Sequence, residues 1–135
     1  DLQAARSLIA GPSGSRRIVA MSRLFLPFIL LALPLFAREA KEDDRINSLL
    51  SHIESLEGAK FVRNGSEHDA KKAADHLRMK LRKAGDRVQT AEDFINGIAT
   101  KSYFTGKPYK IRFKDGSEKD SGPYLHQQLK KVDKQ

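Results

Sequence analysis

The sequence predicts a small, mostly helical α+β domain over residues 38–135, with three to four helices and one short β pairing. Two patterns lead to this class. In several stretches apolar side chains recur every three or four residues, which is the period of an amphipathic helix. In residues 109–114 they alternate with basic side chains, which is the period of a half-exposed strand. An all-helical domain with an irregular segment at 108–114 is the alternative.

Residues 21–37 are predicted to be a secretory signal peptide. Met21–Arg23 is a short positive start, and the apolar run LFLPFILLALPLF follows it and precedes Ala37, which is the layout of such a signal. The run is shorter than the roughly 20 residues of a membrane span, and its two prolines also disfavour a buried helix. We expect cleavage after Ala37, with Ala40 as the alternative, and no stable membrane insertion of the mature chain.

Residues 1–20 are predicted to be an upstream extension outside the fold, because Met21 provides a good start. Ser15-Arg16-Arg17 faintly resembles a twin-arginine export signal. The strongly apolar run that follows favours the general secretion (Sec) route instead. The expected location is therefore the periplasm.

The composition limits the chemistry of the mature chain. The 135 residues include no cysteine and carry a formal net charge of +8. This excludes disulfides, thiol redox chemistry and a lipid anchor on cysteine. A zinc site would need histidines and carboxylates from separate segments, so we predict neither a metal nor a cofactor.

The first helix is predicted over residues 43–57. Asp43 and Asp44 favour its start and Gly58 favours its end. His52 lies off the apolar stripe and is predicted to be solvated, without a role. The stripe consists of Ile46, Leu49, Leu50, Ile53 and Leu56.

The next stretch is predicted to join a strand to the longest helix. Residues 60–63 are the expected partner of 109–114, because a lone strand leaves its backbone groups unpaired. Asn64-Gly65 is predicted to turn the chain. Ser66 is expected to cap a helix over 67–84, whose apolar residues are Ala70, Ala73, Ala74, Leu77, Leu81 and Ala84.

The last third of the chain is predicted to hold two shorter helices. Thr90, with an aspartate three residues later, resembles a capping box at the start of a helix over 91–100. Residues 102–108 and 117–122 are expected to be loops. Pro123 is expected to open a terminal helix that contains Leu125, Leu129 and Val132.

Several blocks of the mature chain resemble the YfeK-like family, a group of small exported bacterial proteins of unknown function. The resemblance covers nearly all of residues 38–135 and implies export and a single domain. It implies no catalytic residues, and the family pattern does not need residues 1–20. The blocks are Phe61–Gly65, Glu67-His68, His76–Lys80, Thr90–Ile95 and Thr105–Tyr109.

A candidate anion site lies at the start of the predicted 67–84 helix. The helix N-terminus, the turn backbone and Arg63 together can bind an anion; the alternative is that Arg63 simply pairs with Glu67. Two histidines eight residues apart on one helix would be about 12 Å apart along its axis, too far to share a metal ion. The candidate binding residues are Arg63, Asn64, Gly65, Glu67, His68, His76 and Tyr109.

A basic surface is predicted on the same helix and on the strand. Such a surface can attract anionic partners, although a charge run is usually just a solvated face. Export makes nucleic acid a poor candidate. The helical residues are Lys71, Lys72, Arg78, Lys80, Arg82 and Lys83, and the strand adds Lys110, Arg112 and Lys114.

These features favour a non-enzymatic periplasmic module that binds an anionic envelope component or a periplasmic protein. The alternative is an enzyme acting on an anionic envelope substrate, with Glu67 and His68 as acid/base groups and Arg63 binding the anion. A third hypothesis is a structural domain that binds another copy of itself. The sequence contains no nucleophile elbow and no complete phosphate loop, which disfavours the enzyme.

Overall fold

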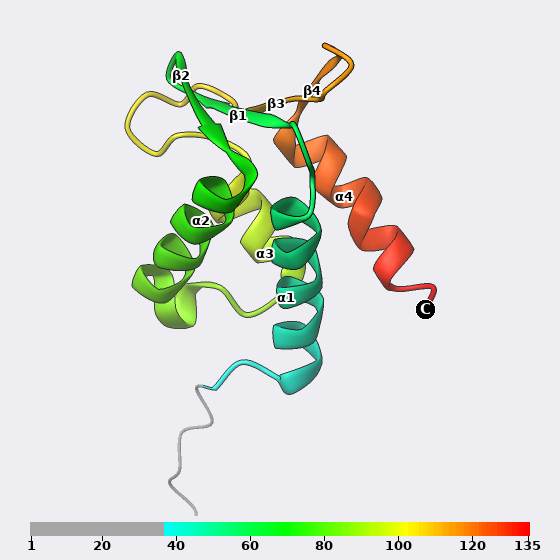
Figure 1. Cartoon of the computed structure of the whole chain (residues 1–135). Coiled ribbons are helices and arrows are strands. Elements are labelled where there is room, and N and C mark those ends of the chain that lie inside the picture. The colour runs from blue at the N-terminus through cyan, green and yellow to red at the C-terminus, as the bar shows by residue number, and fades with distance from the viewer. Residues whose placement is uncertain (1–36) are drawn as a thin grey trace, which may run out of the picture. The chain divides into compact units, whose positions relative to one another are not determined.

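The computed structural model describes residues 37–135, and Phe36–Gln135 form one compact unit. The predicted extension over 1–20 and nearly all of the predicted signal peptide over 21–37 lie outside the described residues. The described part is α+β, as predicted. Helices α1 (Ala40–Glu54), α2 (Ala70–Ala84), α3 (Ala91–Phe94) and α4 (Ser121–Val132) lie on one side of a four-stranded sheet (Figure 1). None of the helices within 37–135 has both the length and the apolar character needed to cross a bilayer.

The sheet is antiparallel and has the strand order β2-β1-β3-β4. Its strands are β1 (Lys60–Arg63), β2 (Ser66–Asp69), β3 (Lys110–Arg112) and β4 (Glu118–Asp120). The predicted pairing of 60–63 with 109–114 is confirmed, with Phe61 opposite Ile111. Successive side chains on a strand point to opposite faces. Phe61 and the fully buried Ile111 therefore face the helices.

The start of the second helix differs from the prediction. Asn64 (φ 50°) and Gly65 (φ 81°) both have positive φ, as a type I′ hairpin turn requires. The chain therefore returns beside β1 as β2, and Ser66 begins this strand instead of capping a helix. Helix α2 starts only at Ala70, where the Asp69 carboxylate accepts a hydrogen bond from the Lys72 amide at 2.8 Å. The predicted turn is correct, but the predicted Ser66 cap is wrong, because strand pairing satisfies the backbone there.

The predicted loop over 117–122 is also wrong in part. It contains β4, which pairs with β3 and leads directly into α4. All three residues of β4 are exposed, so no apolar alternation marks this strand in the sequence. Pro123 is the third residue of α4 rather than its first.

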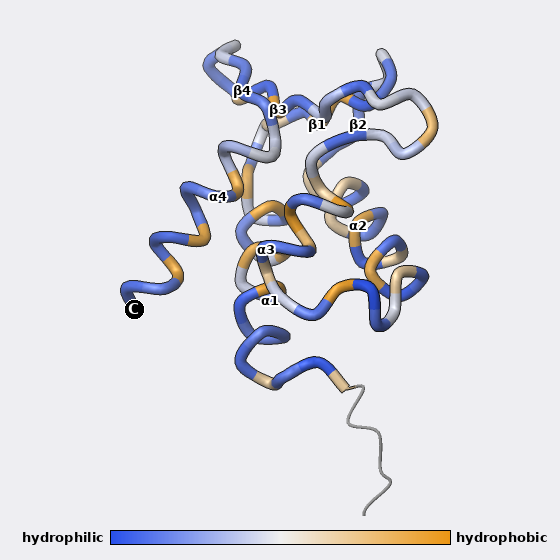
Figure 2. Tube along the Cα trace, turned by 180° about the vertical axis from the view of Figure 1, so that it is seen from behind, coloured by the Kyte–Doolittle hydropathy of each residue, from blue (hydrophilic) through white to orange (hydrophobic). Residues whose placement is uncertain are grey.

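The helices bury their apolar faces in one core. Apolar positions recur along the helices, whereas the strands are mostly hydrophilic (Figure 2). The predicted capping box at Thr90 is confirmed, and the helix that it opens continues from α3 into a π-helical turn, η3 (Ile95–Ala99). The largest fully buried side chains are Phe94, Ile46, Leu49, Leu50, Ile53, Ile95, Ile111 and Leu125.

Candidate functional site

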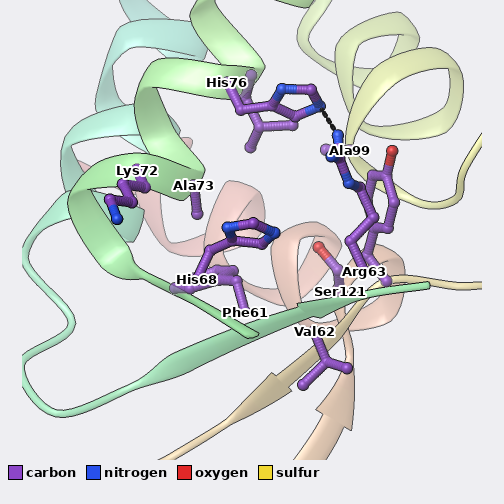
Figure 3. A pocket seen from close by; sticks show the side chains of 11 residues that line it. Phe61, Val62, Arg63, His68, Lys72, Ala73, His76, Ala99 and Ser121 are labelled. Atoms are coloured by element: carbon purple, nitrogen blue, oxygen red, sulfur yellow. Dashed lines mark hydrogen bonds between the residues drawn. The ribbon is translucent and has the colours of Figure 1, made fainter. Parts of the chain in front are cut away.

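A small cavity opens between the β1–β2 hairpin and α2 (Figure 3). Its volume is about 140 Å³ and its walls are mostly apolar. A cavity of roughly this size in another protein holds one benzene molecule, so there is room for one ring-sized group rather than for a nucleotide. The lining residues are Phe61, Val62, Arg63, His68, Lys72, Ala73, His76, Leu77, Ala99, Tyr109 and Ser121.

Strand alternation and helical spacing place the polar groups of this cavity. Phe61 lies opposite His68 in the hairpin, and Arg63, two residues after Phe61, shares their face of the sheet. On α2, Lys72 and His76 are four residues apart and therefore lie on the same side of the helix. Both strands of the hairpin and α2 thus present basic side chains to one cavity.

Arg63 and His76 are in direct contact across the cavity. Arg63 Nη1 lies 2.6 Å from His76 Nε2 (Figure 3). A guanidinium can only donate hydrogen bonds, so Nε2 is the acceptor and the imidazole is neutral. Burial, followed by the positive charges of Arg63 and Lys80, lowers the pKa of His76. A proton on Nε2 would set two donors against each other, and an anion between them would relieve that repulsion.

His68 contributes a polar atom without a partner. Its ring projects into the cavity (Figure 3), and its Nε2 is buried without a hydrogen bond to any described residue. A buried polar atom left in this state costs about 1–3 kcal/mol. A ligand that bonds to this nitrogen would recover that free energy.

Tyr109 and Lys72 complete the polar lining. The Tyr109 hydroxyl accepts a hydrogen bond from Lys80 Nζ at 3.2 Å, and the same ammonium donates to the Ile98 carbonyl at 2.6 Å. Lys72 lines the cavity and is exposed, so its charge lies at the mouth of the cavity. None of the described residues that line the cavity is acidic. The site is therefore cationic over an apolar floor.

The structure thus brings four of the predicted site residues together: Arg63, His68, His76 and Tyr109. Glu67 is not among the described residues that line the cavity, and it is ion-paired with Arg112 on the outer face of the sheet. The alternative pairing of Arg63 with Glu67 is therefore wrong. Glu67 and His68 point to opposite faces of β2 and do not form an acid/base pair.

Asn64 and Gly65 form the hairpin turn rather than an anion site. The Asn64 amide nitrogen donates to Ser102 Oγ at 3.3 Å, and its oxygen accepts from Thr105 Oγ1 at 2.6 Å. No helix begins at this turn, so the N-terminal helix dipole proposed for the anion site is absent there. The side chain of Asn64 instead bonds the turn to the 101–108 loop.

Neighbouring acids pair with four of the nine residues of the predicted basic surface. Arg78 pairs with Glu54 and Asp75, and Lys71 also pairs with Asp75. On the outer face of the sheet, acidic partners hold Arg112 and Lys110. Of the predicted basic helical residues, only Lys72 lines the cavity.

The predictions for His68 and for His52 need correction. His68 lies on β2 rather than on α2, so a helical separation from His76 does not apply and both rings line the same cavity. His52 is half-buried and hydrogen-bonded to the Tyr124 hydroxyl at 2.7 Å, not solvated. Among residues 37–135 no three side chains of the metal-ligating types gather into a metal site.

Known proteins give a family but no activity. Residues 40–133 match DUF5329, a family of unknown function. The chain belongs to this family. Over 82 aligned residues it is 44% identical to the uncharacterized protein YfeK of Salmonella typhimurium strain LT2. The aligned segment covers 60% of this chain and 68% of YfeK. The predicted YfeK-like family is confirmed. No solved structure matches the chain.

Proposed function

We propose that this protein is an exported, non-enzymatic binding module whose cavity holds one apolar group attached to an anion. The observation that carries this proposal is the lining of the cavity by described residues: apolar walls, Arg63 and Lys72 as cations, two imidazoles and, among these residues, no carboxylate. The apolar part of the ligand takes the place of water on the floor, and its anion contacts Arg63. An anionic envelope component is the natural source of such a group.

The anion is proposed to bind together with a proton. At neutral pH the neutral His76 accepts the hydrogen bond from Arg63. An anion beside both side chains stabilises the protonated imidazole and so raises the pKa of His76 toward its ordinary value. Binding should therefore become tighter as the pH falls toward 6.5 and below. The enzyme alternative receives no support, because Glu67 lies outside the cavity.

Small probes test the ligand class. We expect benzoate to shift the NMR resonances of Phe61, His68 and His76, while benzyl alcohol, which lacks the charge, and acetate, which lacks the ring, shift them much less. Arg63→Gln should weaken benzoate binding about tenfold or more, because it removes a charge-assisted hydrogen bond. Arg78→Gln, an arginine paired with acids outside the cavity, is the control. Equal binding of benzoate and benzyl alcohol, or binding that leaves the cavity resonances unmoved, would overturn the proposal.

Export is proposed from the pattern at 21–37 alone and needs a separate test. Expression of the full chain in a Gram-negative bacterium, followed by osmotic-shock fractionation and intact-mass analysis, should give a periplasmic product that begins at Arg38, or at Lys41 if cleavage follows Ala40. A full-length product in the cytosol would contradict export while leaving the cavity proposal standing.

A further inference from the structure

The loop between η3 and β3 presents two adjacent aromatic side chains to solvent. Tyr103 is 90% exposed and Phe104 is 93% exposed, and their rings contact edge to face with centroids 5.6 Å apart. Large aromatic side chains carry about 150–250 Å² each, so this pair leaves several hundred Å² of apolar surface in one patch. A patch of that size is comparable to the largest on a typical monomer, and such patches are often functional.

This loop is held by a set of hydrogen bonds. The Ser102 amide donates to the Lys107 carbonyl at 2.9 Å, and the Gly106 amide donates to the Ser102 carbonyl at the same distance. Lys101 and Pro108 form an antiparallel bridge at the base of the loop. Asn64 adds its two side-chain bonds from the hairpin turn. The aromatic pair is therefore presented by a pre-organised turn, which lowers the entropy cost of binding.

The charged side chains of the loop that carries the aromatic pair are all positive. Lys101 and Lys107 are exposed, and neither forms an ion pair with any described residue. Residues 100–110 contain no acidic side chain. Figure 2 shows an apolar segment at the outer end of this loop, beside the hydrophilic hairpin. An aromatic tip between lysines is complementary to a negatively charged surface with an apolar layer beneath it.

We propose that the 101–108 loop docks on membranes that contain anionic phospholipid. Tyr103 and Phe104 enter the boundary between headgroups and acyl chains, where aromatic side chains are favoured. Lys101 and Lys107 remain at the level of the lipid phosphates, whose surface potential attracts basic residues. A projecting tip fits a fluid interface without a preformed partner pocket. This site does not use the cavity, so it is independent of the function proposed above.

The experiment uses residues 38–135, because Phe36–Gln135 is a compact unit with its own core and the apolar run before it would bind lipid by itself. The chain contains no tryptophan, so Phe104→Trp is a single reporter. Its emission should shift to shorter wavelength with vesicles of phosphatidylcholine and phosphatidylglycerol, and much less with phosphatidylcholine alone. Circular dichroism confirms the fold of each variant.

Matched variants separate the aromatic and charge contributions. In vesicle co-sedimentation, Tyr103→Ser with Phe104→Ser should reduce partitioning by at least about tenfold, whereas Met79→Ser, at an exposed apolar position on α2, should not. Lys101→Ser with Lys107→Ser should reduce it by about tenfold in low salt. The control is Lys41→Ser with Lys134→Ser, which removes the same charge from exposed lysines at the two ends of the described chain.

Three results would overturn the proposal. The first is an emission maximum of the Phe104→Trp variant that no lipid composition shifts. The second is equal partitioning of the double-serine aromatic variant and the Met79→Ser control. The third is sedimentation equilibrium showing a dimer that dissociates in the double-serine aromatic variant, with no binding to vesicles, which would assign the loop to contact between two copies of this chain.

Discussion

Arg45 and Arg63 are both partly buried arginines, but their surroundings are opposite. Arg45 lies between three carboxylates, those of Glu92 at 2.8 Å and of Glu42 and Asp133 at 2.9 Å. Arg63 instead contacts the neutral ring of His76. The charge of Arg45 is therefore neutralised by ion pairs that join α1 to α3 and to Asp133 after α4. The charge of Arg63 faces the cavity without a carboxylate partner among the described residues. Arg45 is therefore suited to stabilise the fold, and Arg63 is suited to bind an anionic ligand.

Loss of Arg45 should have the largest effect on stability. Only 14% of its side chain is exposed, and Arg45→Gln leaves three carboxylates close together without their cation. We expect the free energy of unfolding in urea to fall by about 2 kcal/mol. Arg63→Gln should lower it by less than about 0.5 kcal/mol, because no acid within residues 37–135 loses its partner.

The exposed Arg82, which forms no ion pair within residues 37–135, provides the control substitution Arg82→Gln. If Arg63→Gln destabilises the protein as much as Arg45→Gln does, the distinction between the two arginines fails. Arg63 would then be part of the structural framework.

Substitution of Asn64 should have the next largest effect. Asn64 adopts φ 50°, a conformation that asparagine tolerates better than alanine does. Asn64→Ala also removes the bonds to Ser102 and Thr105, and we expect a cost of about 1–2 kcal/mol. Asn64→Gly keeps the turn conformation and loses only the bonds. If the Asn64 bonds hold the 101–108 loop, both variants should speed hydrogen exchange of the Lys107 amide. Unchanged exchange there would show that the loop holds its shape without the hairpin.

The sequence predicts the helices and the central strand pair well because their signals are local. The apolar stripes, the Thr90 capping box and the alternation around Ile111 each follow from short-range spacing. Other features depend on pairing between distant segments. Ser66 and Asp69 have the spacing of a capping box, yet the hairpin places them in a strand. An Asn-Gly pair is itself a strong signal for a type I′ hairpin. A two-residue turn at 64–65 places His68 opposite Phe61, as the structure shows.

The cavity and the exposed loop could not be predicted from spacing alone. His68 and His76 converge only because β2 folds back over α2. The exposure of Tyr103 and Phe104 depends on the loop closing on itself through Ser102. No local pattern distinguishes these aromatic residues from those that the core buries.

The surroundings of Arg63 and of Arg45 should lose stability in different pH ranges. Burial lowers the pKa of His76, and burial and then Lys131 lower that of His52. The unfolded chain therefore binds more protons than the folded one below pH 6.5, so stability is complete above this pH and declines as the pH falls. Near Arg45 the hydrogen bond from that residue lowers the pKa of Glu92, so its contribution is complete above pH 4.5 and is lost only at lower pH.

Urea unfolding measured across this range should therefore show two separate declines. His76→Gln should reduce the decline that begins at pH 6.5, and Glu92→Gln should reduce the one that begins at pH 4.5. A variant that alters the decline assigned to the other region would show that the two arginine environments are coupled. Arg45 and Arg63 would then belong to one electrostatic network rather than two.

The smallest effect on stability is expected from two neighbours on β2. Glu67→Gln removes one ion pair from the exposed outer face of the sheet, and such pairs contribute little, so its melting temperature should match that of the parent protein. His68→Leu removes the unpartnered Nε2 from the cavity and should preserve or slightly raise stability. Only the second change should weaken benzoate binding. If Glu67→Gln weakens it instead, the ligand contacts the outer face of the sheet, and Arg63 loses the role that distinguishes it from Arg45.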